Sequence, residues 1–111
     1  TNRGLEAVMS SIYPYSIKTY LKLPKSQENF WTIAKTFKDN GYKTIFIYGG
    51  DSQFDNMRGF ALGNGYDEMI DIKYFDKSIK KFTWGVSDED LYKKVLATLN
   101  NSDEPLFITI M

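Results

Sequence analysis

The chain has 111 residues, of which 42% are hydrophobic and 16% aromatic, and this is enough apolar material for the core of one domain. Its 14 basic and 14 acidic residues cancel, so the net charge excludes a general electrostatic attraction to nucleic acid or to an anionic membrane. Cysteine and histidine are both absent, which excludes a disulfide framework, thiolate chemistry and any histidine-based catalytic site built from this chain alone.

The first 40 residues predict two helices joined by an extended loop. Residues 1–12 place apolar side chains at helical spacing, and a proline ends this helix. Residues 15–26 predict an extended loop, with at most a short strand. Residues 28–40 have an apolar face opposite charged residues and end before Gly41, a residue typical of a helix C-terminus. The apolar positions are Leu5, Val8, Met9 and Ile12 in the first helix, and Phe30, Ile33, Ala34 and Phe37 in the second.

Residues 41–65 predict the unit around which the chain is organised. Residues 44–48 form a β-branched and aromatic run, opened by a lysine and ended by two glycines, which is typical of a buried strand. A helix is predicted next, capped by polar residues and stopped by the glycines of residues 63–65. The polar residues are Asp51, Ser52, Asp55 and Asn56, and the apolar face is Phe54, Met57, Phe60 and Ala61. Because ligands bind at the carboxyl ends of strands in open α/β sheets, we expect the functional site here.

The rest of the chain predicts one more helix and a final strand. Residues 66–71 form a short strand or turn. Residues 72–82 interleave lysines with aromatic residues, a pattern that can bind single-stranded nucleic acid, but a solvated loop is the simpler interpretation. Ser87 has the character of an N-cap for a helix that ends near residue 100, with Leu91, Val95, Leu96 and Leu99 facing inward. Residues 107–111 read as a buried strand.

This order of elements predicts crossover α/β units. Helices between buried strands favour a three-layer α/β/α sandwich with a mostly parallel sheet, and an antiparallel α+β arrangement is the weaker alternative. The chain ends on a strand, so we expect residues 1–111 to be a fragment of a larger catalytic domain. Sheet edges left exposed in such a fragment can pair with copies of the same chain.

Three blocks of sequence resemble those of a known protein family and occur in the same order. The blocks are TNRGLEA at the start, FIYGGDSQFDNMRGF followed by GNGYD in the middle, and WGVSDEDL near the end. They resemble the sulfatase-like phosphoglycerol transferases, the lipoteichoic acid synthase group of the alkaline phosphatase superfamily. The resemblance covers nearly the whole chain.

The resemblance implies the chemistry of the whole enzyme. In that family, a membrane-anchored domain on the extracytoplasmic face of the bacterial membrane uses a threonine held against a divalent metal such as Mn²⁺. It takes phosphoglycerol from a phospholipid headgroup and passes it to a glycan or glycolipid acceptor. The threonine position is Thr1 here, which makes Thr1 the expected nucleophile and a metal ligand. From the residues alone, Thr1 is better explained as the N-cap of the first helix.

The family's other metal ligands and a later histidine have no counterpart in this chain. We therefore expect the isolated chain to bind no metal and to be inactive on its own. No run of about 18 apolar residues predicts a membrane span, so the expected anchor belongs to the parent protein. No nucleic-acid partner is expected.

The resemblance also implies contacts to the substrate. The family's Trp-Asn-Arg segment reads Asp55, Asn56 and a methionine here, and Arg58 one residue later can supply a guanidinium that donates to two phosphate oxygens. Arg3 is a candidate for an anion contact, and Trp84 for stacking on a sugar ring. The simpler interpretations are a helix cap for Asp55, surface charges for the arginines and loop packing for Trp84. Asp55 in place of tryptophan puts the family's substrate in question.

Two classes of function stay open. The first is a phosphoglycerol or related phosphoryl transferase of the cell envelope, with a sulfuric ester hydrolase of the same superfamily as its variant. Thr1 argues against the sulfatase variant, because formylglycine-type sulfatases need cysteine or serine in a different signature. The second is a small α/β module that binds an anion at its glycine turn and does no chemistry.

Overall fold

A parallel sheet forms the centre of the molecule. The computed structural model describes residues 2–13, 19, 23 and 30–111. The strands are β1 (Lys43–Ile47), β2 (Glu68–Ile70) and β5 (Leu106–Ile110), in the spatial order β2-β1-β5. The central strand β1 pairs in parallel with both neighbours, and its last residue, Ile47, lies beside Ile70 and Ile110. All three strands therefore end at one edge, which we call the carboxyl edge.

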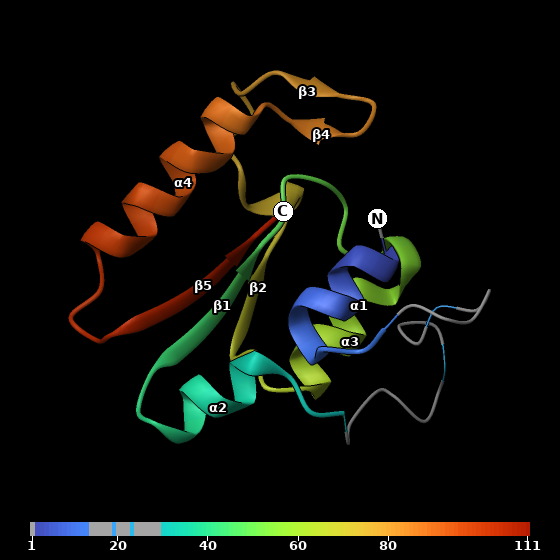
Figure 1. Ribbon diagram of the computed structural model, residues 1–111. Helices are drawn as coiled ribbons and strands as arrows, with labels where there is room; N and C mark the ends of the chain where they lie inside the picture. Colours follow the sequence, from blue (N-terminus) through green and yellow to red (C-terminus); the bar gives the residue numbers. More distant parts are fainter. Residues whose placement is uncertain (1, 14–18, 20–22, 24–29) are drawn as a thin grey trace.

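Helices cover both faces of this sheet (Figure 1). The helices are α1 (Asn2–Ser10), α2 (Ile33–Asp39), α3 (Met57–Gly63) and α4 (Asp88–Asn100). On one face, Phe46 packs with residues of α1, α2 and α3, and Phe60 is fully buried there. On the other face, Ile45 and Ile47 pack with Leu91 and Val95 of α4. The two separate cores make a three-layer α/β/α arrangement, and the predicted fold class is confirmed.

Several predicted elements match closely. Strand β1 begins at Lys43, and α3 ends at Gly63 before Gly65, whose φ of +106° requires glycine. The N-cap role of Ser87 is confirmed, because its side chain accepts a hydrogen bond from the Asp90 backbone N–H at 3.2 Å. Residues 66–71 contain the short strand β2. Most of the predicted loop at residues 15–26 lies outside the described residues.

The helix predicted after the glycine turn begins later than expected. Phe54–Asn56 form a single 3-10 turn (η3), and α3 starts only at Met57. Ser52 does not cap this helix, because its hydroxyl donates to Asp71 instead. Phe54 is 63% exposed, so its predicted place on the apolar face is wrong.

The predicted start of the second helix is also wrong in the described part. The structure begins α2 at Ile33, whereas Trp31 is outside the helix and 52% exposed. Thr32 is the actual N-cap, and its hydroxyl accepts from the Lys35 backbone N–H at 3.4 Å. Residues 24–29 lie outside the described residues.

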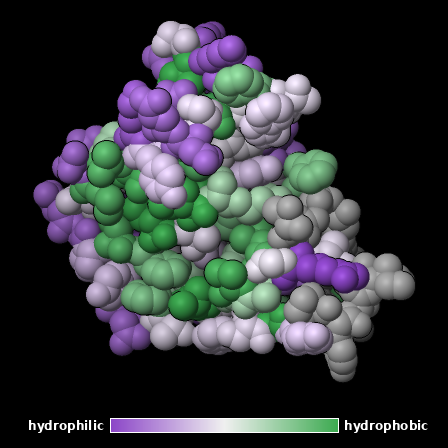
Figure 2. All heavy atoms as spheres, turned by 45° about the horizontal axis from the view of Figure 1, so that its top comes forward, coloured by the Kyte–Doolittle hydropathy of each residue, from purple (hydrophilic) through white to green (hydrophobic). Residues whose placement is uncertain are grey.

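Three apolar residues that were predicted to face inward are exposed, so part of the surface is apolar. Val8 on α1 is 71% exposed, and Leu96 and Leu99 on α4 are also exposed. Strand β5 was predicted to be buried, but it lies at the edge of the described sheet and is half-buried throughout. Figure 2 shows hydrophobic atoms gathered on the side of the molecule where β5 and α4 lie. None of the described helices is long and apolar enough to cross a membrane.

A small hairpin was not predicted at all. Strands β3 (Lys81–Phe82) and β4 (Gly85–Val86) pair antiparallel, and β3 falls at the end of the stretch, residues 72–82, that was interpreted as a loop. A 3-10 turn, η4 (Ile72–Tyr74), precedes them. In Figure 1 the hairpin stands above the carboxyl ends of the three parallel strands.

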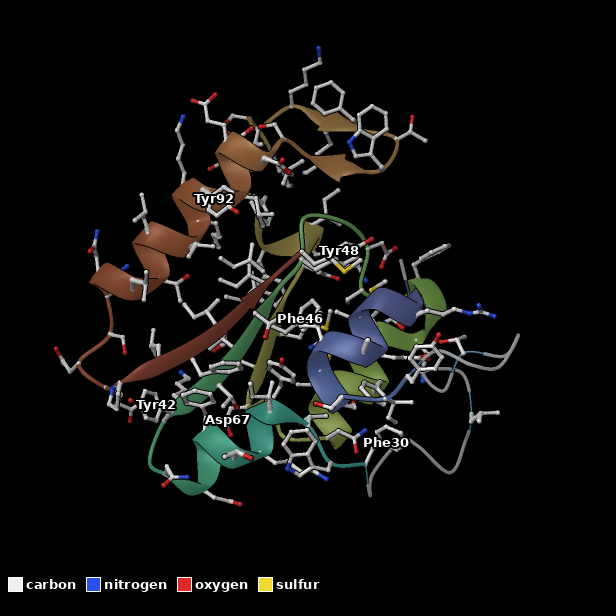
Figure 3. All side chains as sticks on the ribbon, in the orientation of Figure 1. Phe30, Tyr42, Phe46, Tyr48, Asp67 and Tyr92 are labelled. Carbon is white, nitrogen blue, oxygen red and sulfur yellow. The ribbon has the colours of Figure 1, made fainter. Side chains whose placement is uncertain are left out.

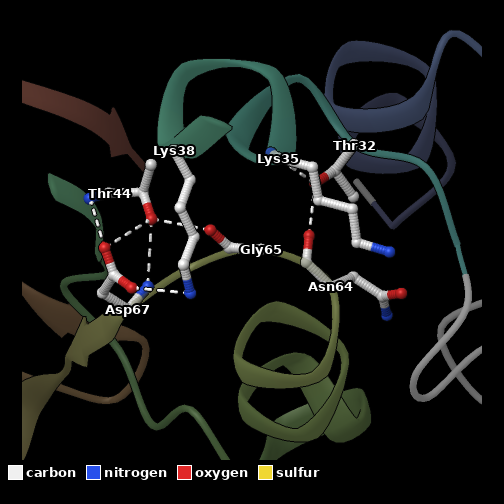
Figure 4. Close-up of polar contacts among 7 residues, drawn as sticks. All are labelled: Thr32, Lys35, Lys38, Thr44, Asn64, Gly65 and Asp67. Carbon is white, nitrogen blue, oxygen red and sulfur yellow. Dashed lines mark hydrogen bonds and ion pairs between the residues drawn. The ribbon is translucent and has the colours of Figure 1, made fainter. Parts of the chain in front are cut away.

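The opposite, amino edge of the sheet is closed by a network of hydrogen bonds (Figure 4). The hydroxyl of Thr44, which is fully buried, donates to the carbonyl of Gly65 at 2.6 Å. The backbone N–H of Thr44 donates to Asp67 Oδ2 at 3.0 Å, and Lys38 Nζ lies 2.8 Å from Asp67 Oδ1. This network connects β1 to the segment that enters β2.

Candidate functional site

The turn after β1 is hydrogen-bonded to three other segments at the carboxyl edge. Gly49 N–H donates to the carbonyl of Met111, directly after β5, at 3.0 Å. The Gly50 carbonyl accepts from the N–H of Ile72 after β2 at 3.0 Å, and the Gly49 carbonyl accepts from Val86 of the hairpin at 2.9 Å. The turn therefore fixes the three strand ends and the hairpin relative to one another.

Glycine is required at two contacts of this edge. A Cβ added at Gly85 would lie 2.2 Å from the Gly49 carbonyl oxygen, and the φ of Gly85 is +140°. A Cβ added at Gly50 would lie 2.7 Å from the ring of Tyr48 and 2.9 Å from the carbonyl of Trp84. Side chains are excluded at both places because backbone segments meet there.

A buried serine and aspartate join the loops that follow β1 and β2. Asp71 Oδ2 accepts from the Ser52 hydroxyl at 2.5 Å and from the Ser52 N–H at 3.1 Å, and Oδ1 accepts from the Lys73 N–H at 3.0 Å. Both Ser52 and Asp71 are buried. Burial acts to raise the pKa of Asp71, but the hydrogen bonds from Ser52 and Lys73 outweigh it and hold the pKa below its ordinary value. Asp71 is thus held as a carboxylate.

A hollow of about 270 Å³ opens at this edge, between the turn after β1 and the hairpin. Its lining residues are Tyr48, Asp51, Phe54, Thr83 and Trp84. Asp51 uses one carboxylate oxygen to accept from the Gln53 N–H at 2.9 Å. In Figure 3, Tyr48 lies at the hairpin end of the sheet, and Asp67 lies at the opposite end. A larger hollow, about 560 Å³, lies on the α4 face, and no predicted site residue lines it.

Among the predicted site residues whose side chains the structure describes, one lies at the hollow. Trp84 lines it, with its side chain 74% exposed. Arg58 is half-buried, and its Nη1 donates to the carbonyl of Met69 in β2 at 3.3 Å. Asn56 is exposed, in a left-handed conformation with φ +59°. Arg3 is exposed in the first turn of α1, whose N-terminal end lies on the same side of the molecule as the carboxyl edge (Figure 1).

Two predicted site residues cannot be placed. Thr1 lies outside the described residues, and so does the side chain of Asp55, whose backbone is in the 3-10 turn. The sequence also gave no role in a ligand site to Tyr48, Phe54 or Asp71. One sequence feature could have indicated a role for Asp71. It is an acidic residue that directly follows a short apolar run, just as Asp51 follows the glycines after β1.

The described residues do not fit a metal site. No group of three or more histidine, cysteine, aspartate or glutamate side chains gathers closely enough in that part of the chain to hold an ion. Asp71 is occupied by hydrogen bonds to Ser52 and Lys73. No chemical step is therefore assigned to a metal on these residues.

The fold and the hollow together indicate a class of protein. A parallel sheet with helices on both faces, and with a hollow at the carboxyl ends of its strands, is an α/β domain of the kind that binds ligands at this edge. The profile of the sulfatase family matches residues 1–111, and the chain belongs to this family. The predicted family resemblance is confirmed.

Individual relatives agree with this assignment. Phosphoglycerol transferase I from Xanthomonas campestris is 32% identical over 67% of this chain, and the protein of that name from Xanthomonas axonopodis is 31% identical. The chain spans about 12% of the length of these relatives. A solved protein of the alkaline phosphatase superfamily from Vibrio parahaemolyticus is 42% identical, with a TM-score of 0.86 over 97% of this chain and 28% of that one. A lipoteichoic acid synthase from Listeria monocytogenes, 21% identical, shares the fold with a TM-score of 0.85 over 98% of this chain and 27% of that one.

Proposed function

We propose that the chain is part of an extracytoplasmic, metal-dependent transferase that moves phosphoglycerol, or a related phosphoryl group, from a phospholipid headgroup to a glycan or glycolipid of the cell envelope. The observation that carries this proposal is the 32% identity to phosphoglycerol transferase I over two thirds of the chain. The carboxyl edge supports it, because the turn, hairpin and hollow there form a fixed frame for a ligand.

In this proposal Thr1 is the nucleophile. It directly precedes α1, whose N-terminal end lies on the carboxyl-edge side. Its oxygen attacks phosphorus, an O–P bond forms, and the P–O bond to diacylglycerol breaks. Diacylglycerol leaves with a proton, and the phosphoglycerol on Thr1 then passes to an acceptor hydroxyl. A divalent metal such as Mn²⁺ would have to be held largely by residues outside the described part of the chain.

Asn56 and Arg58 are proposed to contact the phosphate, with Asp55 and Arg3 nearby. Arg58 suits this role because its guanidinium has five N–H donors, and the contact to the Met69 carbonyl uses one Nη atom. That contact also orients the guanidinium. Trp84 is proposed to contact the transferred group or the acceptor from the hollow.

The experiment measures diacylglycerol release from labelled phosphatidylglycerol, with Mn²⁺ added, by the intact protein and its Thr1→Ala variant. Thr98→Ala is the matched control, because Thr98 lies on α4, where its hydroxyl donates to the Lys94 carbonyl. Loss of turnover in Thr1→Ala alone, with unchanged circular dichroism, is the expected result. Equal turnover in both variants removes Thr1 from the chemistry.

A second candidate is hydrolysis of sulfuric esters, which is favoured by the match of the whole chain to the sulfatase family. If the intact protein releases no diacylglycerol, phosphatidylethanolamine is tested next as donor, followed by an aryl sulfate ester. Activity on the sulfate ester alone selects this candidate. Failure of all three substrates leaves a non-catalytic, anion-binding α/β module as the better account.

A further inference from the structure

The hairpin carries an exposed ladder of one cation and two aromatic rings. The rings of Phe82 and Trp84 are stacked, with centroids 5.3 Å apart and an interplanar angle of 9°. Lys80 Nζ lies 5.0 Å from the centre of the Phe82 ring. Lys80 precedes β3 and Trp84 lies in the turn between β3 and β4, and it is these two ring contacts that bring the three side chains together. Trp84 is 74% exposed and Phe82 38% exposed.

Phe82 is the middle member of this ladder. Lys80 Nζ and the Trp84 ring both contact the Phe82 ring. The exposed rings, together with a lysine, have the chemistry of side chains that lie at a lipid–water interface. Stacking of a sugar ring or a nucleobase on Trp84 is the competing use of the same surface.

Charge around the ladder favours an anionic surface. Lys77, Lys80 and Lys81 are exposed on the stretch that enters the hairpin. Asp76, which also accepts from the Ser78 N–H at 2.8 Å, lies near Lys81. Among the described residues, no ion pair involves Lys77 or Lys80.

Two of the three acidic residues packed nearby take part in an ion pair or a hydrogen bond. They lie in the first turn of α4, where Glu89 pairs with Lys93 at 3.0 Å and Asp90 accepts from the Ser87 hydroxyl at 2.8 Å. Asp88 is the third acid of that turn. Lys77, Lys80 and Lys81 are the cations that this side of the molecule offers to an anionic surface.

The ladder also has a fixed place beside the hollow. The Val86 N–H of the hairpin donates to the Gly49 carbonyl of the glycine turn. The hairpin approaches the turn this closely because Gly85 has no side chain. Trp84 belongs to both the ladder and the hollow, and Phe54, 63% exposed, also lines the hollow. Aromatic side chains thus frame the opening of the hollow.

We propose that this hairpin docks on an anionic phospholipid surface, with Trp84 at the depth of the headgroups and Lys80 and Lys77 facing lipid phosphates. Docking would bring a headgroup to the hollow, and in this respect it rests on the proposed transferase. The docking itself requires no catalysis, so the two proposals can fail separately.

The experiment uses the two tryptophans of the chain as separate reporters. The Trp31→Phe variant reports Trp84 alone, and Trp84→Phe reports Trp31, which is 52% exposed in the segment before α2. Each is titrated with vesicles of phosphatidylcholine alone or mixed with phosphatidylglycerol, with and without a quencher on the acyl chains. We expect a blue shift and quenching of Trp84 only with phosphatidylglycerol, and no change of Trp31.

Charge reversal supplies the matched control. Lys80→Glu should weaken vesicle binding roughly tenfold, because each lysine near an anionic surface contributes about fivefold and reversal adds repulsion. Lys43→Glu makes the same charge change at the amino edge, where Lys43 has only an exposed pair with Glu68 at 3.5 Å, and should leave binding unchanged. Added salt should weaken binding of the unmodified chain.

Three results would overturn the docking proposal. One is a Trp84 spectrum that phosphatidylglycerol vesicles do not change. Another is an equal loss of binding in Lys80→Glu and Lys43→Glu. The third is a Trp84 signal that responds to a neutral oligosaccharide or to single-stranded DNA but does not respond to vesicles. Vesicle docking by the chain, with no diacylglycerol release by the intact protein from phosphatidylglycerol or phosphatidylethanolamine, would instead retain this proposal and reject the transferase.

Discussion

Each edge of the sheet contains a hydroxyl and a carboxylate joined by a hydrogen bond, but the two edges differ in the exposure of their other side chains. At the amino edge, Thr44, Asp67 and Lys38 satisfy one another, and the contacts hold the chain together (Figure 4). At the carboxyl edge, Ser52 and Asp71 are satisfied and buried, yet Phe54 and Trp84, which line the hollow at this edge, stay exposed. A closed network stabilises the fold, whereas a rigid frame with exposed side chains is suited to binding. The difference makes the carboxyl edge the better candidate for the functional site.

The largest effect is expected where the two backbones meet at the carboxyl edge. Gly85→Ala places a methyl group 2.2 Å from the Gly49 carbonyl oxygen at a φ of +140°. Overpacking and backbone strain together should lower the free energy of unfolding by about 3 kcal/mol and displace the hairpin. Urea denaturation measures the stability, and the Trp84 signal in the Trp31→Phe background measures vesicle docking, which should be lost.

Gly41→Ala is the control for this change. Gly41 also has a positive φ, +88°, but no atom lies within 4 Å of the added Cβ. It should cost only about 1 kcal/mol and leave docking intact. If both variants lose the same stability, the close approach of the hairpin to the turn is not what fixes the carboxyl edge.

The next effect belongs to the amino edge. Thr44→Val keeps the shape of the buried side chain but leaves the Gly65 carbonyl without its 2.6 Å hydrogen bond. An unsatisfied buried acceptor should cost about 2 kcal/mol in urea denaturation. Thr44→Ser retains the hydroxyl and should recover part of this stability. Vesicle docking by Thr44→Val, measured where the variant is folded, should be unchanged, and a loss of docking would contradict the division of roles between the edges.

A smaller, pH-dependent effect is expected from Asp71. Burial acts to raise its pKa, but hydrogen bonds from Ser52 and Lys73 lower it, so the folded pKa lies below the unfolded value near 3.8. The carboxylate therefore stabilises the fold above that unfolded value, and this contribution is lost as the pH falls through the folded pKa. Asp71→Asn should cost about 1–2 kcal/mol at pH 7 and flatten the fall of stability in acid.

Asp67 supplies the comparison across the sheet. Burial acts to raise its pKa too, while Lys38 and the Thr44 N–H lower it below the ordinary value. Asp67→Asn should likewise reduce the acid dependence of stability. Only Asp71→Asn should in addition lower the turnover of the intact enzyme, because Asp71 holds the loop whose Ser52 carbonyl accepts from the Arg58 N–H at 3.0 Å. Equal turnover in both variants would mean that the Ser52–Asp71 pair is purely structural.

The sequence predicted local chemistry well and long-range pairing poorly. The strand at β1, the glycine stop after α3 and the Ser87 cap follow from neighbouring residues, so periodicity and cap residues were enough. The Ser52–Asp71 pair joins residues 19 positions apart, and nothing local distinguishes it from a helix cap. The hairpin has strands of two residues each, too short for an alternating pattern to be visible. Both features belong to the candidate site, and this is why the site was predicted less completely than the fold.

Trp84→Ala should have the smallest effect on stability and a large effect on docking. Trp84→Ala removes a side chain that is 74% exposed and stacked only on Phe82, so the free energy of unfolding should change by no more than about 0.5 kcal/mol. Loss of the same residue should abolish most vesicle docking, measured by co-sedimentation with phosphatidylglycerol vesicles. Tyr92→Ala is the matched control, because Tyr92 is a 56% exposed aromatic residue on α4, away from the hairpin (Figure 3). If Tyr92→Ala weakened co-sedimentation as much as Trp84→Ala, exposed aromatic surface in general would explain binding. If Trp84→Ala destabilised the chain by several kcal/mol, the hairpin would be part of the structural frame, and the contrast between the two edges would not hold.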